Sequence, residues 1–325
     1  MMFPSSLTFW FVSTVILCSN PSFAFASLRG NNIIYHPEEQ ASRVLETTVE
    51  ATYLIKDESR EYGRDLQGNP HDQTASLELP DGRIYVVYNA PAQWEKSLKS
   101  GRDKVRIPAG SVFSSDGTVN VKGKNLSKIN EVKNGFVRRN LLGDDAERTH
   151  EQELNLAALQ FTRKLQTGTR RVLAVRVIVN DGAYNHANQA GLSNDVFGNG
   201  IDPVNLKSQY AACSYNQLVF EKSLDRNLLT TITPNIGDTA ISNGVVDIRV
   251  NHNKTAGDGI IVNAVTAEIN RVFGVTNPNQ LANHVMYCLP SGVMSGIAYA
   301  YINSWNSVYS NQWCNYLSGQ MHEVS

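Results

Sequence analysis

Hydrophobic and polar positions follow two different rhythms along the chain, and the rhythm changes near residue 168. From 44 to 121, apolar residues come in short runs rich in β-branched side chains, a pattern that predicts strands. The runs at 77–80 and 84–88 flank Asp81-Gly82, a pair typical of a two-residue hairpin turn. Further strands are expected at 44–55, 105–107, 112–113 and 119–121. This part is therefore predicted to be a small, mainly antiparallel β domain, followed by a helix within 144–165.

The second part of the chain has longer elements. Val172–Val179 is a nearly continuous apolar run, as expected of a strand that is buried on both faces. The clearest helix is predicted at 259–273, where apolar residues recur with a 3.6-residue period. Asp258 is suited to be its N-cap, and Gly274 to take the left-handed conformation after its end.

The remaining elements of the second part are shorter. A helix is expected at 204–212, strands at 217–220, 245–250, 285–289 and 297–302, and loops up to Pro203 and at 230–244. A last helix begins at the end of the chain. The order of elements predicts an α/β (α+β) fold with two domains, at 27–167 and 168–325.

Composition changes this picture little. The 325 residues are 42% hydrophobic and 18% charged, as in an ordinary globular protein. The net charge of −1 gives no electrostatic reason to expect nucleic acid or an anionic membrane as a partner.

The N-terminus has the layout of a secretory signal peptide. A short apolar run, Leu7 to Cys18, precedes Ala24-Phe25-Ala26, whose small residues suit cleavage after Ala26. The run is too short to span a bilayer. We therefore expect residues 1–26 to be a signal peptide, and the mature protein to be extracellular and not held in a membrane.

Cysteine usage is compatible with secretion. Once Cys18 leaves with the signal peptide, Cys213, Cys288 and Cys314 remain, an odd number for an oxidising compartment. One disulfide at most forms among them, and the sequence leaves the pairing open.

The candidate chemistry lies at the end of the chain. His322-Glu323-Val324-Ser325 matches the first four residues of H-E-x-x-H, in which two histidines one helical turn apart bind zinc and the glutamate accepts a proton from the metal-bound water. The pair alone is weak, because His150-Glu151 also occurs, with Leu154 where its second histidine would be.

Several longer stretches of the second part strengthen this interpretation, because together they resemble the gametolysin family of secreted zinc metalloproteases (peptidase M11), relatives of the metzincins. The resemblance covers about 165–325, and its specific part is the last two runs in their order and spacing. The matching stretches are 172–177, 209–214, 284–290, 297–305 and 320–325.

The resemblance implies a metzincin-like catalytic domain that is truncated at its active-site helix, a Zn²⁺ cofactor, and a protein or peptide substrate in the extracellular space or cell wall. His322 would be a zinc ligand and Glu323 the general base. In the family the motif continues to a second histidine, whereas this chain stops at Ser325, so it is expected to bind zinc poorly by itself. By position, residues 27–167 would be the pro-domain of a zymogen.

Two further sets of site residues follow. The strand at 297–302 precedes the active-site helix, as does the edge strand that lines the cleft in metzincins, so Tyr299, Ala300 and Tyr301 are candidates for binding the substrate backbone. Arg170-Arg171, at the end of a polar connector, is a candidate site for proteolytic removal of the pro-domain.

The alternative is a non-catalytic secreted protein, either a pseudoprotease or a binding or adhesion protein. In that interpretation His322-Glu323 is a coincidence, and four aromatic residues form a recognition face, namely Tyr287, Tyr299, Tyr301 and Trp305. His284, at a strand start, and the isolated His186 and His252 are expected to be capped or solvated and not to be metal ligands.

Overall fold

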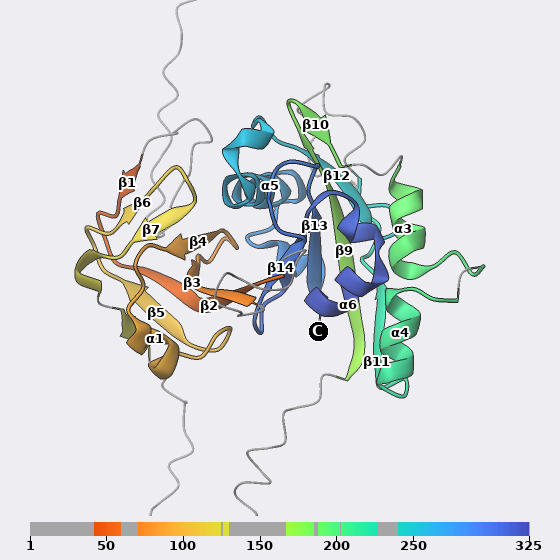
Figure 1. The fold of residues 1–325 in the computed structure, drawn as a ribbon, viewed down its shortest axis with the longest axis horizontal. Helices are drawn as coiled ribbons and strands as arrows, with labels where there is room; N and C mark the ends of the chain where they lie inside the picture. The colour runs from red at the N-terminus through yellow and green to blue at the C-terminus, as the bar shows by residue number, and fades with distance from the viewer. Residues whose placement is uncertain are drawn as a thin grey trace, which may run out of the picture. The chain divides into compact units, whose positions relative to one another are not determined.

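The computed structural model describes residues 42–59, 71–124, 126–129, 167–184, 188–201, 203–226 and 240–324. Residues 40–325 form one compact unit. Its described part is a mixed α/β fold with few helices and a mostly antiparallel sheet of fifteen strands (Figure 1). The signal peptide at 1–26 and the helix expected within 144–165 lie outside the described residues.

The C-terminal part of the sheet is built around β9 (Gly168–Val179), the predicted continuous apolar strand. Its neighbours on both sides run parallel to it, and the last strand of this part, β14, runs antiparallel to β15. The parallel neighbours of β9 are β11 (Leu218–Lys222), β12 (Val245–Arg249) and β13 (His284–Cys288). Beyond β13 follow β15 (Asn306–Tyr309), parallel to β13, and then β14 (Ala298–Tyr301). A short β10 (Gly182–Ala183) folds back on the end of β9.

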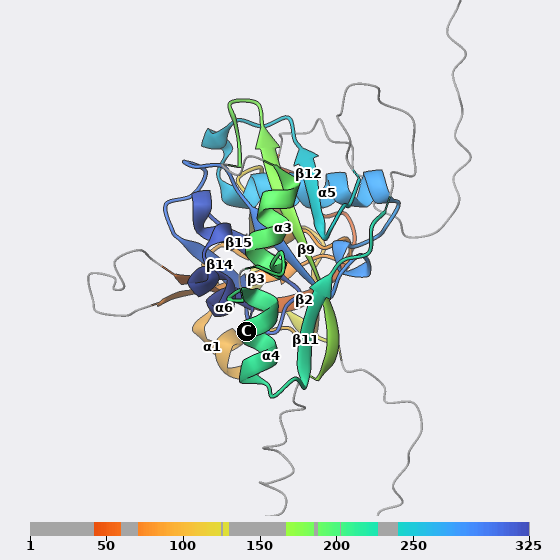
Figure 2. The same ribbon diagram turned by 90° about the vertical axis from the view of Figure 1, so that its right-hand side faces the viewer.

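Both faces of β9 are covered by helices. Leu173 and Val175 belong to the hydrophobic core that includes α5 (Asp258–Phe273), whereas Val172 and Ala174 belong to the core on the opposite face. That second core includes residues of α3 (Gln189–Phe197), α4 (Leu206–Cys213) and α6 (Leu317–Val324). Figure 2 shows α3 above α4, both on the same side of the sheet. The expectation of a strand buried on both faces is thus confirmed.

The N-terminal part carries a separate hydrophobic core, with Tyr53, Leu77 and Val105 fully buried. Its strands are β1 (Arg43–Val44), β2 (Val49–Ser59), β3 (His71–Glu78), β4 (Ile84–Val87), β5 (Lys104–Ile107), β6 (Val112–Phe113), β7 (Thr118–Asn120) and β8 (Ser127–Lys128). One short helix, α1 (Ala92–Ser97), and a 3-10 turn, η1 (Lys122–Lys124), lie between them. The hairpin predicted around Asp81-Gly82 is confirmed, since β3 and β4 pair antiparallel, but its turn is longer than the two residues expected, because the Leu79 N–H donates to the carbonyl oxygen of Arg83 and leaves Pro80 in the loop as well.

Strand β2 joins the two parts into one sheet. One side of β2 pairs with β3, while the other side pairs first with β5 and then, from Lys56 to Ser59, with β14. Side chains alternate accordingly, because Tyr53 lies in the N-terminal core and Leu54 in the core shared with α5. The expected parts 27–167 and 168–325 therefore share a sheet within a single compact unit.

Several elements differ from expectation, among them the short strands β8 and β10 and the early start of β3 at His71. Helix α3 forms where a loop was expected, because Asn188 caps it and Leu192, Val196 and Phe197 share a buried face. Strand β15 and helix α1 were not expected. Helix α5 is confirmed with its left-handed Gly274, although Gly257 is the N-cap and Asp258 is the first helical residue.

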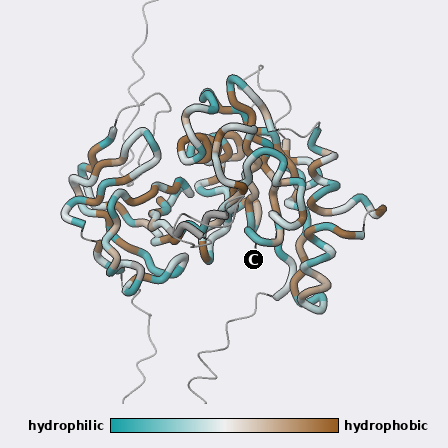
Figure 3. The backbone as a smooth tube through the Cα atoms, in the orientation of Figure 1, coloured by the Kyte–Doolittle hydropathy of each residue, from teal (hydrophilic) through white to brown (hydrophobic). Residues whose placement is uncertain are grey.

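Hydropathy follows these elements. In Figure 3 hydrophobic segments run along the strands of the sheet, with polar segments in the connections between elements. Within the described ranges, we find no helix with the length and apolar character needed to cross a membrane.

Candidate active site at the last helix

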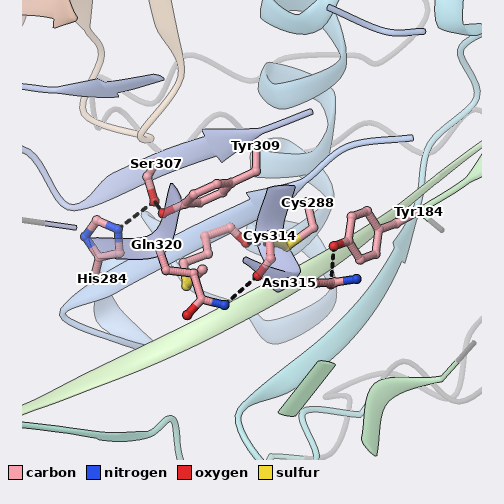
Figure 4. The surroundings of a disulfide bond; sticks show 9 residues. Tyr184, His284, Cys288, Ser307, Tyr309, Cys314, Asn315 and Gln320 are labelled. Atoms are coloured by element: carbon pink, nitrogen blue, oxygen red, sulfur yellow. Dashed lines mark hydrogen bonds between the residues drawn. A yellow bond between two sulfur atoms is a disulfide. The ribbon is translucent and has the colours of Figure 1, made fainter. Parts of the chain in front are cut away.

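Helix α6 is held against one face of the sheet by a disulfide and by hydrogen bonds. Cys288, the last residue of β13, is bonded to Cys314 in the 3-10 turn η4 (Asn311–Asn315) that precedes α6. The fully buried side-chain amide of Gln320 donates a 2.6 Å hydrogen bond to the carbonyl oxygen of Cys314 (Figure 4). The Tyr210 hydroxyl donates to the carbonyl oxygen of Met321 at 3.2 Å. The disulfide answers the question of pairing and leaves Cys213 as an exposed thiol.

His322 and Glu323 occupy the last turn of α6, as predicted, with opposite exposures. The His322 side chain is 52% exposed, whereas that of Glu323 is 3% exposed. His322 Nδ1 and Glu323 Oε1 lie 3.1 Å apart, within hydrogen-bond distance. The helix packs against β14 and β15, so the helix that carries the two residues lies against the strand that was predicted to bind substrate.

A buried polar chain lies beneath α6. His284 Nε2 is 2.8 Å from Ser307 Oγ, and the Ser307 hydroxyl donates to the Tyr309 hydroxyl oxygen at 3.0 Å (Figure 4). Since Ser307 gives its hydrogen to Tyr309, it accepts from His284, which fixes the proton of the neutral ring on Nε2. His284 had been expected to be solvated or to cap an element. It is instead buried in the core.

Burial sets the protonation of this chain. Desolvation lowers the pKa of His284 to about 4, which keeps the ring neutral at physiological pH. Burial also raises the pKa of the Tyr309 hydroxyl well above its usual range, partly offset by the hydrogen bond from Ser307, and repulsion from Glu323 adds to the rise. The chain is thus electrostatically linked to the candidate general base.

Strand β14 carries the three candidate substrate-binding residues. Tyr299 and Tyr301 lie on one face, with ring centroids 5.7 Å apart, and both are buried in the core shared with α5. Ala298 lies in the core on the other face, which confirms the predicted alternation. Both sides of β14 are paired, with β15 and with β2, so in residues 40–325 it is an interior strand and not the expected open edge.

The aromatic recognition face of the alternative interpretation is wrong. Each of its four residues is at most 9% exposed, and each belongs to the core around α5. Their packing includes an edge contact between Tyr287 and Trp305, and the Tyr287 hydroxyl lies 2.9 Å from the Thr266 hydroxyl. These side chains therefore stabilise the fold and have no surface with which to meet a partner.

Arg170 and Arg171 lie inside a strand. They are the third and fourth residues of β9 and pair in parallel register with Phe220 and Glu221 of β11. A processing protease binds an extended segment of substrate, so cleavage between these arginines would require this end of the ladder to open.

The remaining predicted positions add no metal ligand to His322. Within the described ranges, no group of three or more His, Cys, Asp or Glu side chains could hold a metal ion. His252 is partly buried, and this burial lowers its pKa, while His186 lies outside the described residues. His322 and Glu323 fit the first positions of H-E-x-x-H, but the described residues do not complete a zinc site.

A buried carboxyl that sequence reasoning missed lies between the two parts of the chain. Glu78 Oε1 accepts a 2.6 Å hydrogen bond from Trp305 Nε1 and a 3.3 Å bond from Asn277 Nδ2. Glu78 alternates with Leu77 and Leu79, which suggests a solvent-facing position, yet the C-terminal part covers it. The only signal in the sequence was a charged residue within a strongly apolar strand pattern.

Comparison with known proteins adds no assignment. No protein-family model, no curated protein and no solved structure matches this chain.

Proposed function

We propose that this chain belongs to a secreted zinc metalloendopeptidase of the gametolysin type, with a metzincin-like catalytic part at 168–325 and a pro-domain at 27–167. The observation that carries the proposal is the packing of α6 against β14 and β15, with His322 and Glu323 on the last turn of that helix. A histidine–glutamate pair beside a strand of suitable length is what cleavage of an extended peptide requires.

Two other features support the proposal. The parallel strands β9, β13 and β15 are followed in the sheet by the antiparallel β14, and the chain passes from β14 through β15 and η4 into the helix that carries the motif, in agreement with the resemblance in sequence. The disulfide between Cys288 and Cys314 is typical of a protein that matures in an oxidising compartment, which supports secretion.

The chemistry assigns distinct tasks to the two residues. Zinc, when bound, would polarise the scissile carbonyl and lower the pKa of a water molecule. His322, the exposed member of the pair, would supply one ring nitrogen as a ligand. The Glu323 carboxylate would accept a proton from the attacking water and pass it to the leaving amine. The position of Glu323 is fixed by the packing of α6 and by its contact with His322.

The proposal requires further ligands after Ser325, and the gene tests this directly. We expect the codon directly after Ser325 to encode a histidine, and the codon six positions after that one to encode a second histidine. The product that includes them should bind about one zinc ion per chain and cleave unstructured peptides. A stop codon at that point would instead assign a non-catalytic role, and a complete motif without stoichiometric zinc would contradict the proposal.

A further inference from the structure

The outer side of β14 is occupied by a strand from the N-terminal part of the same chain. Strand β2 runs antiparallel to β14, with Tyr301 opposite Lys56, Ala300 opposite Asp57 and Ala298 opposite Ser59. An extended peptide that adds to the edge of a sheet makes the same type of ladder. Within residues 168–325 this side of β14 would be an edge, so β2 holds the position that such a peptide would take.

The hydrogen-bond pattern shows which backbone groups are used. The Ile302 N–H donates to the carbonyl oxygen of Ile55 at 3.0 Å. Bonded pairs alternate in an antiparallel ladder, so Ala300 and Asp57 form the next bonded pair, while Tyr299 directs its N–H and carbonyl to β15. The edge groups that an incoming peptide would need are therefore satisfied by β2.

The end of this ladder is closed by a serine. Ser100 Oγ accepts from the Ile55 N–H at 2.8 Å and donates to the carbonyl oxygen of Ile302 at 2.7 Å, bridging the two strands. Beside it, Gly101 approaches so close that an added Cβ would lie 2.3 Å from the carbonyl oxygen of Asn303. The N-terminal part is thus fitted to the end of β14 and does not merely touch it.

One side chain of β2 makes a specific contact with the face of β14. The Lys56 ammonium lies 3.8 Å from the centre of the Tyr299 ring and 3.8 Å from Asp258 Oδ2. An aromatic face next to a carboxylate is a good site for a cation. Lys56 is well buried there, with 13% of its side chain exposed.

We propose that β2 occupies the side of β14 to which a substrate peptide would bind. In doing so, β2 blocks that edge, and its own sequence indicates which peptides the edge accepts. The inference rests on the proposed function, in which β14 holds the substrate backbone. A peptide that replaces β2 would run antiparallel to β14 and place a Lys or Arg side chain over Tyr299 and next to Asp258. The substrate class is therefore an extended peptide with a basic residue, and the N-terminal part is its competitive inhibitor.

Two proline variants of the complete chain test whether β2 occupies the outer edge of β14. Asp57→Pro removes the N–H that β2 donates to β14, whereas the matched control Glu58→Pro removes one that points to β3. Amide hydrogen exchange at Ala300 and Ile302 should become roughly tenfold faster or more in Asp57→Pro, and should change little in Glu58→Pro. Lys56→Glu is a second variant, which leaves the backbone hydrogen bonds of β2 intact. It should also speed this exchange, because the new carboxylate would repel Asp258.

The probe for the opened edge is a synthetic peptide with the sequence of residues 49–59, together with a twin in which the lysine is replaced by glutamate. The lysine peptide should bind Asp57→Pro and Lys56→Glu but not the parent chain, and the glutamate twin should bind roughly tenfold more weakly or worse. If β14 amides are released but neither variant binds the peptide, the inference is wrong. It is also wrong if both peptides bind equally.

Cleavage separates this inference from the proposed function, because peptide binding needs neither zinc nor catalysis. In the gene product that extends past Ser325, Asp57→Pro should cleave a basic peptide faster than the parent does. Equal cleavage rates in Asp57→Pro and the parent would contradict the proposed inhibition by β2 and leave the protease assignment intact. Binding without any cleavage would overturn the protease assignment and leave the peptide site.

Discussion

The indole nitrogen of Trp305 donates a 2.6 Å hydrogen bond to the buried carboxyl of Glu78, which joins β3 of the N-terminal part to the loop before β15. Asn277 also donates to this oxygen, at 3.3 Å. Burial raises the pKa of Glu78, and the two hydrogen bonds only partly offset it. The folded protein therefore favours the protonated form of this carboxyl more than the unfolded chain does.

This relationship predicts a pH dependence of stability. For a carboxyl with a raised pKa, the stabilising contribution is complete below the unfolded value near 4.5 and is lost as pH rises through the folded value. Glu78→Gln cannot ionise but still offers an oxygen to Trp305. We expect its melting temperature to exceed that of the parent at pH 8, with a smaller difference at pH 5.

The matched control is Glu78→Ala, which leaves the Trp305 N–H without its acceptor. It should lower the free energy of unfolding by about 1–3 kcal/mol at pH 5, where the parent carboxyl keeps its stabilising contribution, and by less at pH 8. Scanning calorimetry of the three proteins at pH 5 and pH 8 makes the comparison. An identical pH profile for Glu78→Gln and the parent would show that the carboxyl does not titrate as described.

The buried His284 should make the free energy of unfolding depend on pH in the opposite direction to Glu78. Its pKa is lowered by burial from 6.5 to about 4, so the neutral ring stabilises the fold above pH 6.5, and this contribution is lost as pH falls toward 4. The loss is on the order of 3 kcal/mol. His284→Gln, which keeps a hydrogen-bonding amide near Ser307, should flatten this acid limb.

Urea unfolding between pH 4 and 7 measures the effect, with His322→Gln as the control, because that side chain is 52% exposed. The control should keep the acid limb of the parent. A steep limb that survives in His284→Gln would assign the acid sensitivity to other groups.

The disulfide makes a prediction about the anchoring of α6. Cys288 and Cys314 are 26 residues apart, and closing a loop of this size stabilises a protein by about 3–4 kcal/mol. Cys314→Ser should lose about that much in denaturant unfolding, whereas the exposed Cys213→Ser should change stability by less than about 0.5 kcal/mol. The product of residues 27–325 should contain one thiol that reacts without denaturant, and three reactive thiols would contradict the pairing.

Because β14 pairs with β2 on one side and with β15 on the other, proline at two neighbouring positions of β14 should affect folding differently. Ala300→Pro removes an N–H that points to β2, so the fold should survive with β2 loosened and a loss of about 1–2 kcal/mol. Tyr299→Pro removes the bond to β15 and a side chain from the core, so it should not fold. Circular dichroism and hydrogen exchange at Ile302 distinguish them, and unfolding of both would show that β14 is inseparable from its neighbours.

The sequence predicted the elements whose apolar pattern is regular. The continuous run of β9 and the helical stripe of α5 belong to the centre of the fold, where burial leaves little choice of residue type. Strand β15 was missed because two of its four residues are the buried polar Asn306 and Ser307. Ser307 is hydrogen-bonded in the core by His284, and a partner so distant in sequence leaves no local pattern.

The candidate site was predictable to a similar extent. The motif identified His322 and Glu323, and alternation placed Tyr299 and Tyr301 on one face. The pairing of β2 with β14 was not predictable, because the paired residues of β2, from Lys56 to Ser59, are all polar and resemble the end of a solvated strand. Backbone ladders carry no information in side-chain type, so the pairing of β2 with this side of β14 became visible only in the fold.

The most direct test of the central claim is a Glu323→Gln variant of the gene product that extends past Ser325. Zinc content by mass spectrometry and cleavage of an extended basic peptide should be measured together, with Asp57→Pro added to both proteins to open β14. The account predicts that Glu323→Gln retains one zinc ion per chain and loses cleavage by a factor of about 10² or more, since only the proton carrier is removed. Zinc retained with undiminished cleavage would contradict the assignment of Glu323 as the general base and, with it, the proposed mechanism.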